Sequence, residues 1–166
     1  MSLSFRLAGP DDVAHAAAMI DAIDRHYLGD DKAPGLAATT EMVAKAIHAH
    51  EGTRFLLAFD GGTPVGVACF AILRPGHRLS GLIFVKDLFV LAERRGGGTG
   101  KALLGWLAAY AKENGIGRME LTTEPRNPGA VRLYESLGAE KPEKIYFRFP
   151  PEVLTRLARD HGPPKG

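Results

Sequence analysis

The chain has 166 residues, of which 45% are hydrophobic and 24% charged, and its formal net charge is +2. This length suits one domain with a sizeable core, and the small net charge gives no indication of a nucleic-acid partner. The single cysteine, Cys69, excludes an internal disulfide and a cysteine-based metal cluster. Since Cys69 lies in a strand-like run, it is better interpreted as a small core residue than as a nucleophile. We expect no membrane span and no signal peptide, and therefore a cytoplasmic protein.

The first half of the chain predicts a strand, two helices and a hairpin. Acidic residues after Pro10 favour a helix start, and apolar residues then recur at three- and four-residue steps. A Gly-Gly dipeptide between two apolar runs is typical of a hairpin turn. The expected elements are a strand at 4–8, a helix from Pro10 to Tyr27, a loop at 29–38, a helix capped by Thr39 or Thr40 and ending near Ala49, and a hairpin of 55–59 with 65–73.

The second half predicts alternating strands and helices. The nearly continuous apolar run at 82–91 indicates a strand buried on both faces at the centre of the sheet. Asn127-Pro128 is a strong helix start, and Gly138 is a strong stop. The expected elements are a strand at 82–91, a glycine-rich turn at 95–100, a helix at 101–112, a strand at 119–123, a helix at 128–138, a strand at 145–149, a short helix at 151–159 and a frayed tail at 162–166.

The glycine-rich turn, Arg95-Gly-Gly-Gly-Thr-Gly100, is the most informative segment. Three consecutive glycines cost conformational entropy without adding packing, so they favour a functional interpretation over a plain turn. The N–H groups at a helix start, with the helix dipole behind them, suit a phosphate or pyrophosphate. A nucleotide-binding P-loop would need Gly at 95 and Ser or Thr at 102, where the chain has Arg95 and Ala102. A dinucleotide fingerprint would need Gly at 101, where the chain has Lys101.

The pattern that fits is R-x-x-G-x-G, formed by Arg95, Gly98 and Gly100. It resembles the acetyl-CoA pyrophosphate loop of the GNAT superfamily of N-acetyltransferases. Upstream, Asp87-Leu-Phe-Val90 resembles the central strand of that family. Downstream, the helix motif of the family is similar to N-x-x-A-x-x-x-Y-x-x-x-G-A over 127–139. The three motifs stand in the family's order and cover about residues 82–139.

This resemblance implies a single α+β (α/β three-layer) N-acetyltransferase domain over residues 1–161. Its mixed central sheet would be flanked by helices and splayed between the fourth and fifth strands, with acetyl-CoA in the opening. The backbone of the central strand would pair with the pantetheine amides, and the turn would bind the pyrophosphate. No metal is expected. The residues implied in cofactor binding are Leu88, Phe89, Val90, Arg95, Gly96, Gly97, Gly98, Thr99, Gly100, Lys101 and Asn127.

The resemblance also implies two catalytic residues. Tyr134 would be the general acid that protonates the departing CoA thiolate, although its helical spacing alone would suggest a core tyrosine. Asp87 is a candidate base for the acceptor amine, with Glu120, Glu124 and a water relay as alternatives. Around these positions the chain is most similar to diamine acetyltransferases of the spermidine/spermine type. Those enzymes tend to have Glu-Asp where this chain has Lys86-Asp87, which casts doubt on a polyamine acceptor.

The acceptor and the oligomeric state are the least constrained by the sequence. Tyr27, Asp30 and Asp31 could hold a small cationic amine, or could belong to a solvated acidic loop. The aromatic segment 145–149 suggests a homodimer, or alternatively a strand inside one subunit. The function predicted is acetyl transfer from acetyl-CoA to a primary amine, with neither nucleic acid nor membrane as partner. The alternatives are a CoA-binding sensor or interaction module with a degraded catalytic site, a protein N-acetyltransferase, and a nucleotide-binding phosphate loop.

Overall fold

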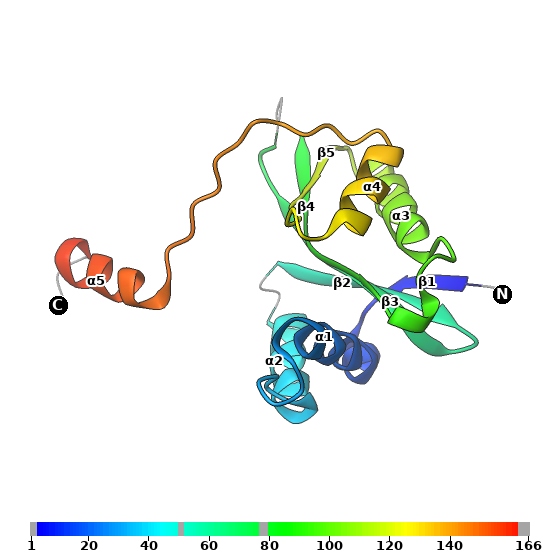
Figure 1. Cartoon of the computed structure of the whole chain (residues 1–166), viewed down its shortest axis with the longest axis horizontal. Helices are drawn as coiled ribbons and strands as arrows, with labels where there is room; N and C mark the ends of the chain where they lie inside the picture. The colour runs from blue at the N-terminus through cyan, green and yellow to red at the C-terminus, as the bar shows by residue number, and fades with distance from the viewer. Residues whose placement is uncertain (1–2, 50–51, 77–79, 163–166) are drawn as a thin grey trace. The chain divides into compact units, whose positions relative to one another are not determined.

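The computed structural model describes residues 3–49, 52–76 and 80–162 (Figure 1). It falls into two compact units, Met1–Asn127 and Pro128–Gly166. Two short 3-10 helices, Pro10–Asp12 and Ala92–Arg94, precede α1 and α3. The other elements of the first unit are β1 (Leu3–Leu7), α1 (Val13–Leu28), α2 (Leu36–His48), β2 (Thr53–Asp60), β3 (Thr63–Leu73), β4 (Gly81–Val90), α3 (Thr99–Glu113) and β5 (Ile116–Leu121).

The five strands form one mixed sheet in the order β1-β2-β3-β4-β5. The first four strands pair antiparallel with their neighbours, whereas β5 runs parallel to β4. The expected mixed sheet is therefore confirmed. The expectation that the strand at 82–91 lies at the centre of the sheet is wrong, because β4 lies next to the edge strand β5.

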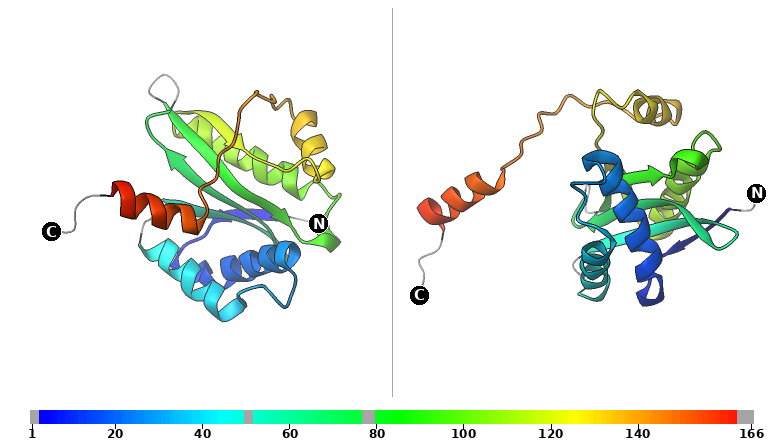
Figure 2. Two further views of the ribbon diagram at one scale, coloured as in Figure 1. Left: turned by 60° about the vertical axis from the view of Figure 1, so that its left-hand side comes forward. Right: turned by 60° about the horizontal axis from the view of Figure 1, so that its bottom comes forward.

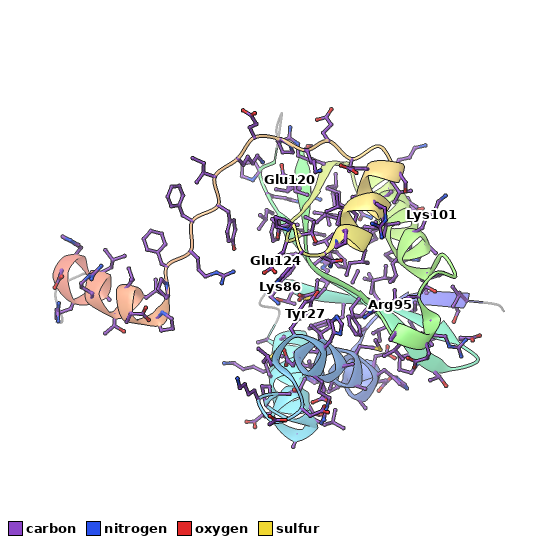
Figure 3. The ribbon with its side chains drawn as sticks, in the orientation of Figure 1. Tyr27, Lys86, Arg95, Lys101, Glu120 and Glu124 are labelled. Atoms are coloured by element: carbon purple, nitrogen blue, oxygen red, sulfur yellow. The ribbon has the colours of Figure 1, made fainter. Side chains whose placement is uncertain are left out.

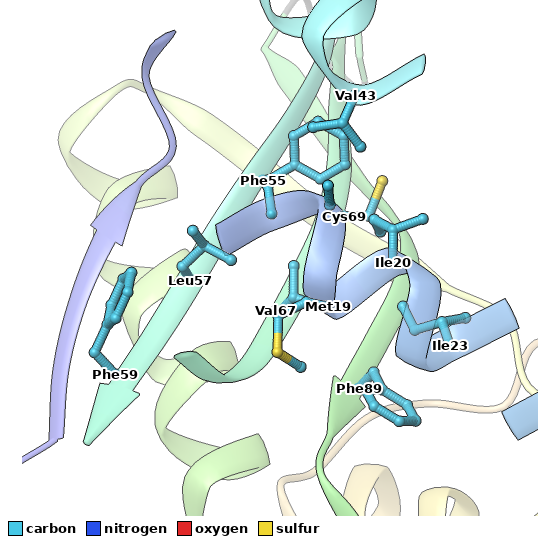
Figure 4. Close-up of a cluster of buried hydrophobic side chains, with 12 residues drawn as sticks. Met19, Ile20, Ile23, Val43, Phe55, Leu57, Phe59, Val67, Cys69 and Phe89 are labelled. Carbon is cyan, nitrogen blue, oxygen red and sulfur yellow. The ribbon is translucent and has the colours of Figure 1, made fainter. Parts of the chain in front are cut away.

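Helices cover both faces of this sheet and bury a separate core on each (Figure 2). On one face α1 and α2 pack over alternate residues of β2, among them Phe55, Leu57 and Phe59 (Figure 4). On the other face α3 packs over the intervening residues, which include Leu56. Because side chains alternate along a strand, β2 contributes to both cores and is almost continuously apolar.

Several sequence-based boundaries shift in the first unit. α2 begins at Leu36 after Gly35, so Thr39 and Thr40 lie inside the helix; the Thr40 hydroxyl donates to the Leu36 carbonyl oxygen at 2.7 Å. β5 ends at Leu121, two residues before the predicted end. The predicted turn near residue 76 reaches into residues 77–79, which lie outside the described ranges.

The second unit contains α4 (Pro128–Ser136) and α5 (Pro151–His161). α4 stops as predicted, because Gly138 adopts a φ of 84° and the Ala139 N–H donates back to the Tyr134 carbonyl oxygen at 3.0 Å. The predicted strand at 145–149 is wrong, since residues 139–150 form neither helix nor strand. A strand needs a neighbouring strand, and in this segment the large apolar side chains are exposed. Of the predicted tail, residues 163–166 lie outside the described ranges.

Candidate active site

The sheet opens into a fork, which begins where β4 and β5 stop pairing. Their parallel register runs from Gly81 opposite Ile116 to Val85 opposite Leu121. β5 ends there, whereas β4 continues to Val90. The predicted splay between the fourth and fifth strands is confirmed, and among the described residues no strand pairs with residues 86–90 of β4 on that side.

A β-bulge lies directly at the fork. Asp87 pairs with Cys69 on β3, but Val85 pairs with the next residue of β3, Phe70, so Lys86 is the additional residue. The bulge switches the faces of β4: Val85 packs in the core under α3, whereas Phe89 packs in the core under α1 and α2. Without the additional residue, alternation would put positions 85 and 89 on the same face.

The direction of the backbone groups beyond the bulge follows from one hydrogen bond. The Leu91 N–H donates to the Val65 carbonyl oxygen of β3 at 3.1 Å. Because backbone groups alternate in direction along a strand, those of Phe89 also point to β3, and those of Leu88 and Val90 point into the fork. The backbone groups of Leu88 and the N–H of Val90 can therefore pair with an extended ligand in the manner of an added strand.

The glycine-rich turn has the backbone conformation that its glycines allow. Gly96 and Gly98 have φ values of 80° and 84°, which side-chain-bearing residues rarely adopt. Gly98 is the N-cap of α3, and the Ala102 N–H donates to its carbonyl oxygen at 2.9 Å. The N–H groups of residues 99–101 precede that bond and have no acceptor within the helix, as in any first turn. The turn thus presents N–H donors and the positive end of α3.

Two arginines fix the approach to this turn. Arg94 forms an ion pair with Asp60 at the end of β2, with 2.5 Å between Nη1 and Oδ2. Arg95 folds back onto β4: its Nε donates to the Val90 carbonyl oxygen at 2.9 Å, and its guanidinium lies 5.4 Å from the Phe89 ring centroid. Arg95 and Lys101 are both exposed (Figure 3), and they add positive charge to the turn.

Thr99 has a packing role that the sequence did not indicate. Thr99 is buried, and a Cβ atom built on Gly66 of β3 would lie 3.3 Å from its Cγ2 and 3.2 Å from the Phe89 carbonyl oxygen. Gly66 therefore lets the first turn of α3 approach β3 and β4 closely. This contact holds the glycine-rich turn against the end of β4.

The C-terminal end of α1 lies against β4 beyond the bulge. The His26 ring is 5.7 Å from the Phe89 ring and 5.1 Å from the Tyr27 ring, centroid to centroid. Tyr27 is 62% exposed, although it continues the three- and four-residue apolar periodicity of α1, which predicts a buried side chain. Asp30 is engaged by Arg25, with 3.0 Å between Oδ1 and Nη1, whereas Asp31 is exposed.

Lys86 and Asp87 form an ion pair with 2.7 Å between Nζ and Oδ2. Although partial burial lowers the pKa of Lys86, the hydrogen bond and charge of Asp87 outweigh this effect, and the pKa lies above its usual value. Asp24 of α1 is close enough to add to this stabilisation. Burial and then the charge of Asp87 raise the pKa of the Cys69 thiol to about 11, against an opposing effect of Lys86. Cys69 is thus a protonated core residue, in line with the sequence analysis.

The other candidate bases are also paired. Glu120 on β5 lies 3.3 Å from Arg118, between Oε1 and Nη1. Glu124 is in the loop after β5, not in a strand, and forms an ion pair with Arg126. At the bulge, the structure brings Asp87 into contact with Lys86.

The remaining predicted residues lie near the junction of the two units in the sequence. Asn127 ends the first unit, and its N–H donates to the Glu124 carbonyl oxygen at 2.9 Å. Tyr134 lies on α4 of the second unit and is half-buried. Its role as general acid stays a prediction.

The sequence analysis missed Asp24 and His26 as neighbours of the fork. The available signal was helical spacing, because Asp24 precedes Tyr27 by three residues and so lies on the same side of α1. Within the described ranges, no group of three or more His, Cys, Asp or Glu side chains could hold a metal ion. None of the helices described is both long and apolar enough to cross a membrane.

Comparisons with known proteins agree with this geometry. The profile of the acetyltransferase (GNAT) family matches residues 18–139. The chain is 33% identical over 92 residues to an uncharacterized N-acetyltransferase of Methanocaldococcus jannaschii, and 31% identical over 80 residues to the thialysine N-epsilon-acetyltransferase of Mus musculus. These alignments cover 55% and 46% of this chain, and 41% and 47% of the relatives. The chain thus spans less than half the length of the curated relatives it matches.

Solved structures share the fold. An integron cassette protein from the mobile metagenome of V. cholerae is 30% identical, with a TM-score of 0.89 over 96% of this chain and 99% of that one. An aminoglycoside N-acetyltransferase in complex with CoA is 20% identical, with a TM-score of 0.67 over 89% of this chain and 93% of that one. By the family profile over most of its length, the chain belongs to the acetyltransferase (GNAT) family.

Proposed function

We propose that this protein transfers an acetyl group from acetyl-CoA to a primary amine of a small cationic molecule. The observation that carries the proposal is the continuity of the fork with the glycine-rich turn. Leu88 and Val90 offer backbone groups in the fork, and the N–H groups of 96–101 follow on the same chain. An extended pantetheine arm that ends in a pyrophosphate requires first a strand edge to pair with and then a group of N–H donors for the phosphates.

In the proposed reaction the neutral amine attacks the thioester carbonyl carbon. The new C–N bond forms, the C–S bond breaks, the amine nitrogen loses one proton and the CoA sulfur gains one. Tyr134 supplies the proton to the sulfur, and Asp87, directly or through water, accepts the proton from the nitrogen. An amine that arrives as an ammonium ion first releases one further proton to solvent.

Binding of the cofactor is tested by isothermal titration of acetyl-CoA into wild type, Gly97→Glu and Gly97→Gln. Gly97 has no positive φ, and a Cβ there would meet only the Arg94 carbonyl oxygen at 3.8 Å, so the position accepts a Cβ atom without strain. The two variants differ in charge and not in size. A phosphate at the turn predicts that Glu weakens binding at least tenfold more than Gln does. Equal affinities in both variants, or no binding to wild type, would remove the cofactor assignment.

The role of Tyr134 is tested by Tyr134→Phe. Loss of a general acid lowers kcat by about 10²–10⁴-fold, while the ring and the affinity for acetyl-CoA are retained. Unchanged turnover of a good amine would exclude Tyr134 from the mechanism. Binding of acetyl-CoA without turnover across a broad amine panel would instead favour a CoA-binding sensor.

We further propose that the protein is a cytoplasmic homodimer. Ile145, Phe147 and Phe149 alternate along the extended segment and are 82%, 77% and 59% exposed, which supports contact with a second copy. The free thiol of Cys69 fits a reducing compartment. Light scattering at micromolar concentration checks the mass, and Phe147→Glu should shift a dimer to monomer. A monomeric wild type would exclude the dimer.

A further inference from the structure

The bulge gives the fork a pair of opposite charges at the point where the strands separate. Neighbouring residues of a regular strand point to opposite faces, so the irregular backbone favours the 2.7 Å contact between the side chains of Lys86 and Asp87. Asp87 shares its face with Cys69, its partner on β3, and thus lies toward α1. The additional residue at 86 brings an ammonium group to the same place.

The ammonium group of Lys86 is available to a ligand. Its side chain is 73% exposed, while that of Asp87 is 22% exposed. A lysine ammonium has three N–H donors, of which the Asp87 carboxylate uses one. An exposed ion pair of this kind contributes little to folding stability, so the fold does not explain the presence of Lys86.

The charges near Lys86 indicate what kind of acceptor fits. Asp87 and Asp24 can attract the ammonium form of an acceptor amine, whereas Lys86 repels any second positive group that lies beside it. A carboxylate beside the amine would instead meet the free donors of Lys86. The Lys86–Asp87 pair is therefore complementary to a molecule that carries both charges.

Given the proposed acetyl transfer, on which this inference rests, we propose that the acceptor is a zwitterionic, amino-acid-like amine. Lys86 binds its carboxylate, and Asp87 and Asp24 face its amine. By the same arrangement Lys86 selects against diamines and polyamines, which carry a second cation and no carboxylate.

The test compares amines that differ only in the carboxylate, namely lysine with cadaverine and ornithine with putrescine. Steady-state release of CoA thiol gives kcat and KM for wild type, Lys86→Met, Lys86→Arg and the control Lys112→Met, an exposed lysine of α3. We expect wild type to favour the amino acid in kcat/KM by about tenfold or more. Lys86→Met should abolish this preference through the KM of the amino acid, Lys86→Arg should retain it, and Lys112→Met should not change it.

Equal preference in wild type and Lys86→Met, or a wild-type preference for the diamine, would overturn the inference while leaving acetyl transfer intact. If no amine is turned over, calorimetry of lysine and cadaverine with the CoA-saturated protein gives the same comparison at equilibrium. If lysine bound no more tightly to wild type than to Lys86→Met in this calorimetry, the inference would also be overturned. Failure of acetyl-CoA itself to bind would be seen separately, in the titrations of the Gly97 variants.

Discussion

Replacing Gly98 with alanine measures how far the glycine-rich turn depends on its backbone conformation. Gly98 has φ 84° and ψ 0°, and a Cβ there would have no atom within 4 Å. The cost is therefore conformational and not steric, about 1–2 kcal/mol for an L-residue in the left-handed region. Alanine also lowers the entropy of the unfolded chain, which offsets about 0.4–1 kcal/mol of that cost.

Gly97→Ala is the matched control, because it adds the same methyl group one residue earlier without a positive φ. The unfolded-state contribution is common to both variants and cancels in their difference. Gly98→Ala should therefore be less stable than Gly97→Ala by about 1–2 kcal/mol, or roughly 2–8 °C in Tm for a chain of this size. Urea unfolding followed by circular dichroism measures the free energy of unfolding of both variants. Equal stabilities would refute the assignment of a left-handed N-cap at Gly98.

Three further predictions concern the first unit. Gly66→Ala puts a Cβ 3.2–3.3 Å from three neighbouring atoms and should lower the free energy of unfolding, measured in urea, by about 1–3 kcal/mol. Gly105→Ala, in open space on α3, should be neutral or stabilising. Equal effects of the two substitutions would contradict the close contact of α3 with β3. With its pKa near 11, Cys69 is about 0.1% ionised at pH 8, so iodoacetamide should label native protein at least 100-fold more slowly than urea-unfolded protein. Rapid labelling of the native protein would contradict the burial of this thiol. The Arg6 hydrogen bond, opposed by burial, lowers the pKa of Asp12, so its contribution is present at neutral pH and lost as pH falls through the folded-state pKa. The Tm difference between wild type and Asp12→Asn should accordingly shrink from pH 7 toward pH 3, and a difference independent of pH would argue against this ion pair.

Local signals in the sequence predicted the parts of the site that depend on local chemistry. The glycine-rich turn was identified because glycine is needed where φ is positive, as the structure shows at 96 and 98. Gly138 ended a helix for the same reason. The fork was implied by the family resemblance, and the end of β5 at Leu121 confirms it.

Features that depend on pairing between strands were not predicted. The bulge at Lys86 is visible only in the register with β3, because nothing in the residue itself marks an additional position. Tyr27 fits the apolar periodicity of α1, yet at this end of the helix the neighbouring His26 ring lies against Phe89 of β4, and the Tyr27 ring is exposed. The segment 145–149 has the alternation of a strand, but alternation does not supply a neighbouring strand.

The bulge has a consequence for how this protein can change during evolution. Position 86 pairs with no residue of β3, and its side chain is mostly in solvent. The sheet therefore places few demands on the amino acid found there, while the neighbouring Asp87 and Phe89 are tied to the core by their register. A single substitution at 86 can alter the charge beside the proposed acceptor amine without a folding defect that other mutations must first repair. If the proposed acceptor site is right, the preference for one amine over another can thus change by single substitutions while the fold stays the same.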